Sequence, residues 1–168
     1  MTQATRIGIA VVAMLALIAA PAFAKTNFNT HLSGKDQVPT RETQATGQAK
    51  FMVSSDGSSL EFRINVSNIE NVVAVRLGNA PVGATGPDVA VLFGPVAAGG
   101  GKSTGVLAKG TLTATNLVGP MAGRTISDLI TEIEAGRIYV NVVTDDGVGA
   151  PDEKPGDFAS GEIRGQLQ

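Results

Sequence analysis

The sequence predicts an all-β protein, an immunoglobulin-like or Greek-key antiparallel β-sandwich with one short helix. Several segments alternate apolar and polar residues with a period of two, which is typical of half-buried strands. Glycine is frequent, with 21 residues, and it is spread along the chain, which favours many turns between short strands. Only one segment has its apolar residues at helical spacing. Strands with a single short helix indicate a sandwich or a Greek-key barrel.

The first residues have the pattern of a secretory signal peptide. Arg6 precedes an apolar run from Ile7 to Ala20, and Ala22-Phe23-Ala24 follows as a small-residue cleavage site. The alternative, a membrane anchor, is disfavoured because a helix needs about 20 apolar residues to span a bilayer. We expect residues 1–24 to be cleaved without leaving a stable membrane anchor. Residues 25–168 then form one exported domain, either periplasmic or secreted.

The composition argues against several classes of function. The chain has no cysteine, which excludes thiolate catalysis, thiolate metal sites and disulfides. Without Arg6, the 13 basic residues become 12 against 15 acidic ones, a net charge of −3. An acidic chain with few aromatic residues and no tryptophan is a poor candidate for a nucleic-acid partner.

Alternation predicts the strands in chain order. The segments 47–57 and 60–67 form a hairpin, because Asp56-Gly57 is a strong signal for a tight turn. Within the first of them, Ala49 and Phe51 face the core and Lys50 faces solvent. The other expected strands are 27–34, 72–77, 88–93, 105–117, 137–144 and 161–167.

The segment "TISDLITEIEAG", residues 125–136, predicts the one helix, of two to three turns. Its apolar residues are Ile126, Leu129, Ile130 and Ile133, at a spacing that puts them on one face. Thr125 or Ser127 suits the start of this helix, and Gly136 suits its end.

Motifs for enzymatic chemistry are few. The segment "AGGGKST", residues 98–104, resembles a phosphate-binding loop, but Val96 stands where that motif requires a glycine. We expect a mobile linker there. The only histidine, His31, lies on the polar face of the first strand, and no Gly-x-Ser-x-Gly sequence occurs. We therefore expect that the protein is not an enzyme.

The acidic loop that follows residue 144 is the best candidate for a metal site. Hard cations such as Ca²⁺ bind several oxygen ligands on a bendable loop. The candidate ligands are Asp145, Asp146, Asp152, Glu153 and Asp157. Their spacing differs from that of an EF-hand, and Lys154 opposes cation binding. A solvated loop without a cofactor remains the alternative.

The ordered set of segments resembles the chordin-type (CHRD) domain family. The resemblance begins with "FNTHLSGKDQVPT" (28–40) and "ATGQAKFMVSSDGSSLEFRINVSNI" (45–69). It continues with "VRLGNAPVGATGP", "GTLTATNLVGP" and "IEAGRIYVNVVT", and ends with "GEIRGQL". It implies a β-rich domain of secreted proteins, bacterial members included. In chordin, such domains belong to an extracellular protein that binds growth factors.

The resemblance also implies histidines that this chain lacks. Family members usually carry His-x-His at the positions of Ala74 and Arg76, and a third histidine at that of Val143. Such residues would share one face and form a three-imidazole metal cluster. Alanine, valine and arginine have no lone pair to donate to a metal. We therefore expect that histidine-based metal chemistry is lost here.

Two polar residues at the end of the predicted strand 72–77 are candidates for binding, namely Arg76 and Asn79. We expect the loop 78–87, rich in Gly and Pro, to lie at the same end of the sandwich as the acidic loop. Arg76 would then meet Asp145 or Asp146.

The sequence therefore favours a non-enzymatic exported binding or structural module that contacts another protein or an envelope polymer. The alternative is a calcium-stabilised adhesive domain or a degenerate metal-binding relative. The sequence leaves the partner and the oligomeric state open.

Overall fold

The computed structural model of the chain describes residues 26–151 and 153–168. The predicted signal peptide and Asp152 lie outside the described residues. The strands are β1 (Asn27–Ser33), β2 (Thr46–Val53), β3 (Ser59–Glu70), β4 (Val72–Asn79), β5 (Asp88–Phe93), β6 (Lys102–Thr113), β7 (Ile138–Thr144) and β8 (Ile163–Gln166). The helix α1 spans Ile126–Glu134, and short 3-10 turns are η1 (Gly34–Asp36), η2 (Ala114–Asn116) and η3 (Gly119–Met121).

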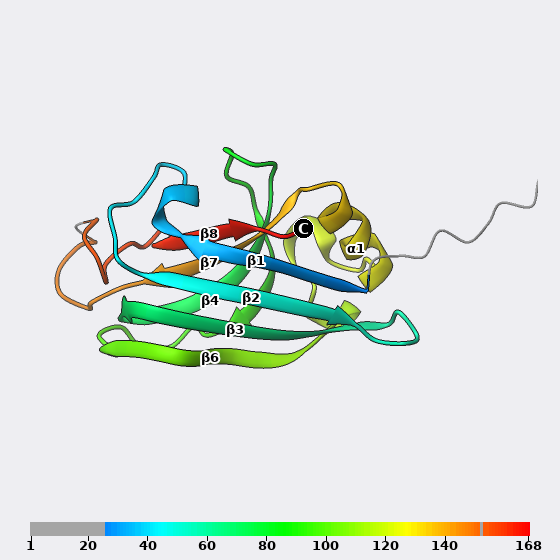
Figure 1. Cartoon of the computed structure of the whole chain (residues 1–168), viewed down its shortest axis with the longest axis horizontal. Coiled ribbons are helices and arrows are strands. Elements are labelled where there is room, and N and C mark those ends of the chain that lie inside the picture. Colours follow the sequence, from blue (N-terminus) through cyan, green and yellow to red (C-terminus); the bar gives the residue numbers. More distant parts are fainter. Residues whose placement is uncertain (1–25, 152) are drawn as a thin grey trace, which may run out of the picture.

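The eight strands form one antiparallel sheet in the order β5-β4-β7-β8-β1-β2-β3-β6 (Figure 1). The edge strands β5 and β6 contact each other, so the sheet curls until it is nearly closed. The predicted antiparallel all-β fold with one short helix is confirmed. Because β8 joins β7 to β1, the two halves of the fold belong to one continuous sheet.

The hairpin of β2 and β3 shows how the alternating sequence determines the fold. Ala49 and Phe51 are buried, whereas Lys50 between them is exposed. At the turn, the Asp56 carboxylate accepts hydrogen bonds from the Ser54 hydroxyl and from the backbone N–H of Ser58. These bonds stabilise the charged form and lower the pKa of Asp56 to about 2.

The core lies between the two halves of the curled sheet, and α1 closes one end of it (Figure 1). The helix begins at a capping box, in which Thr125 and Asp128 each bond the backbone N–H of the other. Four of its apolar side chains are buried in the core: Ile126, Leu129, Ile130 and Ile133. The predicted helix is confirmed. No helix in the described part of the chain is long and apolar enough to cross a membrane.

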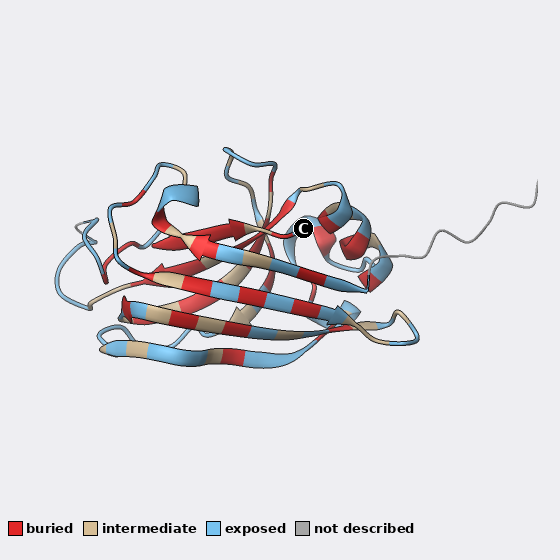
Figure 2. Ribbon diagram, viewed as in Figure 1, coloured by how far each residue is buried: buried red, intermediate tan, exposed pale blue. Residues whose placement is uncertain are grey.

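The outer surface of the sheet is covered on one side and bare on the other. On β4, β7 and β8, outward positions such as Ala74, Tyr139, Val143 and Arg164 are buried, and the loop after β4 contacts Tyr139 and Arg164. The outer faces of β1, β2, β3 and β6 lie side by side, and no segment of the described residues crosses them (Figure 1). Along β1, β2 and β3, exposed and buried positions alternate, whereas β6 is mostly exposed (Figure 2).

Candidate functional site

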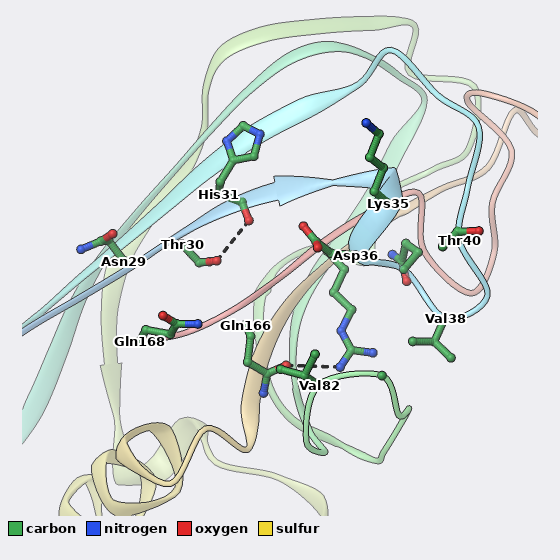
Figure 3. Close-up of a pocket in the computed structure, with 13 residues that line it drawn as sticks. Asn29, Thr30, His31, Lys35, Asp36, Val38, Thr40, Val82, Gln166 and Gln168 are labelled. Atoms are coloured by element: carbon green, nitrogen blue, oxygen red, sulfur yellow. Dashed lines mark hydrogen bonds between the residues drawn. The ribbon is translucent and has the colours of Figure 1, made fainter.

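A polar cleft of about 660 Å³ lies between β1, β8 and the segments 35–40 and 82–83 (Figure 3). Strands β1 and β8 are paired at Ser33 and Arg164, and the cleft lies beside this pairing. The polar groups of its lining are Asn29, Thr30, His31, Lys35, Asp36, Gln37, Thr40, Arg164, Gln166 and Gln168. Such a lining suits a ligand with many hydrogen-bonding groups.

The buried cation of this cleft is Arg164, which is only 2% exposed. Its guanidinium stacks on Tyr139, 3.5 Å from the ring centroid, and donates to the backbone oxygen of Ala84 at 2.7 Å. Arg164 makes no ion pair with any carboxylate that the structure describes. Burial lowers the pKa of Arg164, and the negative charge of Asp36 opposes this shift. A buried guanidinium without a paired carboxylate gives the cleft a positive charge.

The loop after β4 lies over Tyr139 and Arg164 and is hydrogen-bonded to both side chains. A side chain at Gly78 would place its Cβ 2.2 Å from Cζ of Tyr139, so only glycine lets the ring lie against β4. The Tyr139 hydroxyl donates to the Gly86 carbonyl at 3.1 Å and accepts from the Gly86 N–H at 3.3 Å. Gly78 on β4 thus makes room for the Tyr139 ring, and the Tyr139 hydroxyl holds the loop at Gly86 against the sheet.

The expectation that Arg76 meets Asp145 or Asp146 is wrong. Arg76 forms an ion pair of 3.0 Å with Asp88 on β5, and both side chains remain partly exposed. The register explains the error, because Val72 at the start of β4 is opposite Thr144. The loop after β4 and the loop after the antiparallel β7 therefore lie at opposite ends of the sheet.

Asn79, the other candidate for binding, lies beside the helix α1. Its amide donates to the Glu132 carboxylate at 3.4 Å, and Glu132 also accepts two hydrogen bonds from Arg137. The bonds from Arg137 are the main cause of the lowered pKa of Glu132. This network attaches the end of β4 to α1, and a binding role for Asn79 stays a prediction.

The structure brings together three of the predicted metal ligands. Asp145, Asp146 and Asp157 place one oxygen each within 4.8 Å of one another, and Asp157 is buried. The ammonium of Lys154 lies 3.3 Å from Asp146. Glu153 points elsewhere and pairs with Arg41 at 3.1 Å, and Asp152 lies outside the described residues.

Sequence reasoning missed the role of Glu162, which is 1% exposed. Its carboxylate accepts hydrogen bonds from the hydroxyls of Thr43 and Thr144 and from the Gly156 N–H. Glu162 thus joins the acidic loop and the segment before β2 to the sheet. Alternation correctly put Glu162 on the outer face, but nothing local indicates that two distant loops cover it.

The positions to which the family resemblance assigns histidines lie close together. Ala74 is directly opposite Val143 in the register of β4 and β7, and both are buried. Arg76 lies two residues further along β4, opposite Asn141. A family model, the CHRD domain, matches residues 28–150.

The chain belongs to the CHRD domain family. The match covers β1 to β7 with α1 and ends within the acidic loop, so β8 with Arg164 lies beyond it. The predicted resemblance is confirmed, whereas the histidines of relatives at positions 74, 76 and 143 stay a prediction. No curated protein and no solved structure matches the chain.

Proposed function

We propose that this CHRD domain is a non-enzymatic binding module, which contacts another protein or an envelope polymer through the polar cleft between β1 and β8. The observation that carries the proposal is Arg164, a buried cation that lines this cleft without a carboxylate partner among the described residues. The guanidinium donates to the backbone oxygens of Pro81 and Ala84 and to the side chain of Gln166, all of which are neutral. An anionic group of a partner would balance its charge.

The lining of the cleft favours binding over catalysis. A catalytic base needs a group that orients it and a nucleophile within hydrogen-bond reach. The imidazole of His31 makes no hydrogen bond with any residue that the structure describes. The neighbouring Thr30 hydroxyl donates to the backbone oxygen of His31. These residues therefore offer polar contacts without an oriented catalytic pair.

We infer that the module works outside the cytoplasm, in the periplasm or after secretion. The CHRD domain is an extracellular type of domain, which fits an exported protein. The signal-peptide pattern of residues 1–24 supports the same inference.

Photo-crosslinking tests the binding function. A photoreactive amino acid replaces Val82 at the cleft, or Val148 in the acidic loop as a control, because both valines are 76% exposed. Irradiation of intact cells should give an adduct with a protein or polymer from position 82 and little from position 148. Absence of an adduct at position 82, or chemical conversion of the captured partner by the purified protein, would contradict the proposal.

A calcium-stabilised domain is the second candidate, supported by the convergence of Asp145, Asp146 and Asp157. A ligand that binds only the folded state stabilises it by about 2.7 kcal/mol at 100 times its dissociation constant. Ca²⁺ should then raise the melting temperature of the EDTA-treated protein, and Asp145→Asn/Asp146→Asn should abolish the rise. Glu61→Gln/Glu134→Gln is the control of equal charge change. An identical melting curve with EDTA and Ca²⁺ would exclude this candidate.

A further inference from the structure

The bare face of the sheet carries a row of three cations on adjacent strands. Lys50 on β2 is directly opposite Arg63 on β3, and Arg63 is directly opposite Lys109 on β6. All three side chains are exposed. We call Lys50, Arg63 and Lys109 the basic row. Because neighbouring strands lie about 4.8 Å apart, its charges recur at roughly that interval across the sheet.

The basic row is unfavourable for the isolated protein. Like charges directly opposite on neighbouring strands destabilise a sheet. None of the three cations makes an ion pair with a described residue. Six other cations do form ion pairs: Arg41, Arg76, Lys102, Arg124, Arg137 and Lys154. Arg63 donates one hydrogen bond, from its Nε to the side-chain oxygen of Asn65 at 3.4 Å, but no described carboxylate neutralises the row.

A groove runs along the basic row, across the strands. One hollow of about 430 Å³ lies over β1, β2 and β3, and another of about 410 Å³ lies over β3 and β6. The two hollows share Glu61, Phe62 and Arg63 in their linings. The side of the groove opposite the basic row is formed by a second row of residues that are directly opposite one another on neighbouring strands. These residues are Asn27, Met52, Glu61 and Thr111.

The groove adjoins the polar cleft at Asn29, which lines both. The two remaining cations without an ion pair among the described residues, Lys35 and Arg164, line the cleft. Five cationic and two anionic side chains, the latter Asp36 and Glu61, therefore line the cleft and the groove, a net side-chain charge of +3. The whole chain has a net charge of −2, so this surface is the basic region of an acidic protein.

We propose that the groove binds a linear acidic polysaccharide, which lies across the strands with its carboxylates at the basic row and one end in the cleft. This inference rests on the proposed binding function and names its partner. Charge complementarity selects a polyanion whose charges recur at short intervals. Asn27, Asn29 and Thr111 supply amides and a hydroxyl for the sugar hydroxyls.

Other polyanionic partners fit the surface less well. A single-stranded nucleic acid needs exposed aromatic rings on which its bases stack. The rings that border the groove, those of Phe28, Phe51 and Phe62, belong to or pack against the core. An anionic membrane would require several apolar side chains that insert. The large exposed apolar residues are Met52 in the lining of the groove and Val82 in that of the cleft.

Binding to polygalacturonate, with its methyl-esterified form as the uncharged control, tests this inference. The protein comprising residues 25–168 should bind the acid form in low salt, and added salt should weaken binding. The variant Lys50→Gln/Arg63→Gln/Lys109→Gln should lose affinity about ten-fold or more. The matched variant Lys102→Gln/Arg124→Gln/Lys154→Gln removes three ion-paired cations elsewhere and should bind like the wild type.

Equal loss of affinity in both triple variants would overturn the inference, because net charge alone would then explain binding. Equal binding of the esterified polymer, or tighter binding to DNA or to phosphatidylserine vesicles, would overturn it as well. Crosslinking of a protein from position 82 without polygalacturonate binding would preserve the binding module and reject only the polysaccharide. The melting temperature of each variant confirms that it is folded.

Discussion

The guanidinium of Arg164 on β8 lies 3.5 Å from the ring centroid of Tyr139 on the neighbouring strand β7. This contact buries a cation at the cleft and places the Tyr139 hydroxyl against the Gly86 backbone. The cleft therefore depends on a stacked pair that the loop after β4 covers.

Tyr139→Phe should release that loop while keeping the stacked pair. The variant retains the ring but loses both hydrogen bonds with Gly86, so the free energy of unfolding should fall by about 1 kcal/mol. Urea denaturation measures the loss, and hydrogen exchange should accelerate at Gly86 but not in β2. Unchanged exchange at Gly86 would show that the hydroxyl does not hold the loop.

Gly78→Ala should destabilise the protein by about 1–3 kcal/mol, because the new methyl group overlaps the Tyr139 ring. Gly100→Ala is the control, since a Cβ at Gly100 meets no atom within 4 Å. Denaturant unfolding compares the two variants. Equal stability would mean that the Tyr139 ring moves aside at no cost.

Glu162→Ala should lower the free energy of unfolding by about 3 kcal/mol. It leaves the buried Thr144 hydroxyl, the buried Gly156 N–H and the half-buried Thr43 hydroxyl without their acceptor. Glu61→Ala, an exposed carboxylate on β3, should change stability by less than about 0.5 kcal/mol. Chemical denaturation of both variants checks this difference. A loss at Glu162 no greater than that at Glu61 would refute the anchoring role.

Asp128 at the start of α1 should make the stability of the folded protein depend on pH in the acidic range. Hydrogen bonds from Thr125 hold the pKa of Asp128 below its ordinary value of 3.8. The stabilisation is therefore complete above pH 3.8 and is lost as the pH falls through the lower pKa of the folded state. Asp128→Ala should lower the melting temperature at pH 7, and this deficit should shrink below pH 3.8. Glu134→Ala on the same helix is the control, and a deficit independent of pH would contradict the assignment.

Arg63→Gln should raise stability slightly while it weakens binding of the acidic polymer. The substitution removes two like-charge contacts, with Lys50 and with Lys109, worth about 0.2–1 kcal/mol each. Lys102→Gln should instead leave stability almost unchanged or lower it, because Lys102 pairs with Glu70. A loss of stability in Arg63→Gln would indicate a structural role for Arg63.

The strands and the helix could be predicted because local patterns determine them. Phe51 alternates with Lys50 on β2, and Thr125 marks the start of α1. The cleft and the basic row could not be predicted, because they depend on register between distant segments. Arg63 and Lys109 are separated by β4 and β5 in the sequence, yet they lie opposite each other. One residue of slip would turn Lys109 toward the core face.

The ends of the sheet were harder to predict than its faces. The expected contact between Arg76 and the acidic loop required β4 and β7 to run in parallel. They are antiparallel, so Arg76 meets Asp88 across the adjacent strand β5. Similarly, Glu162 and Arg164 alternate outward as expected, but loops that are remote in sequence bury them.

Chemical-shift mapping tests the central claim most directly. Oligogalacturonate is titrated into ¹⁵N-labelled protein comprising residues 25–168, and the backbone amide signals are followed. Binding in the groove and cleft should shift the signals of Asn29, Lys50, Arg63 and Lys109, with no change around Asp145. Shifts confined to the acidic loop, or no shifts at saturating ligand, would contradict a binding surface built on β1, β2, β3 and β6.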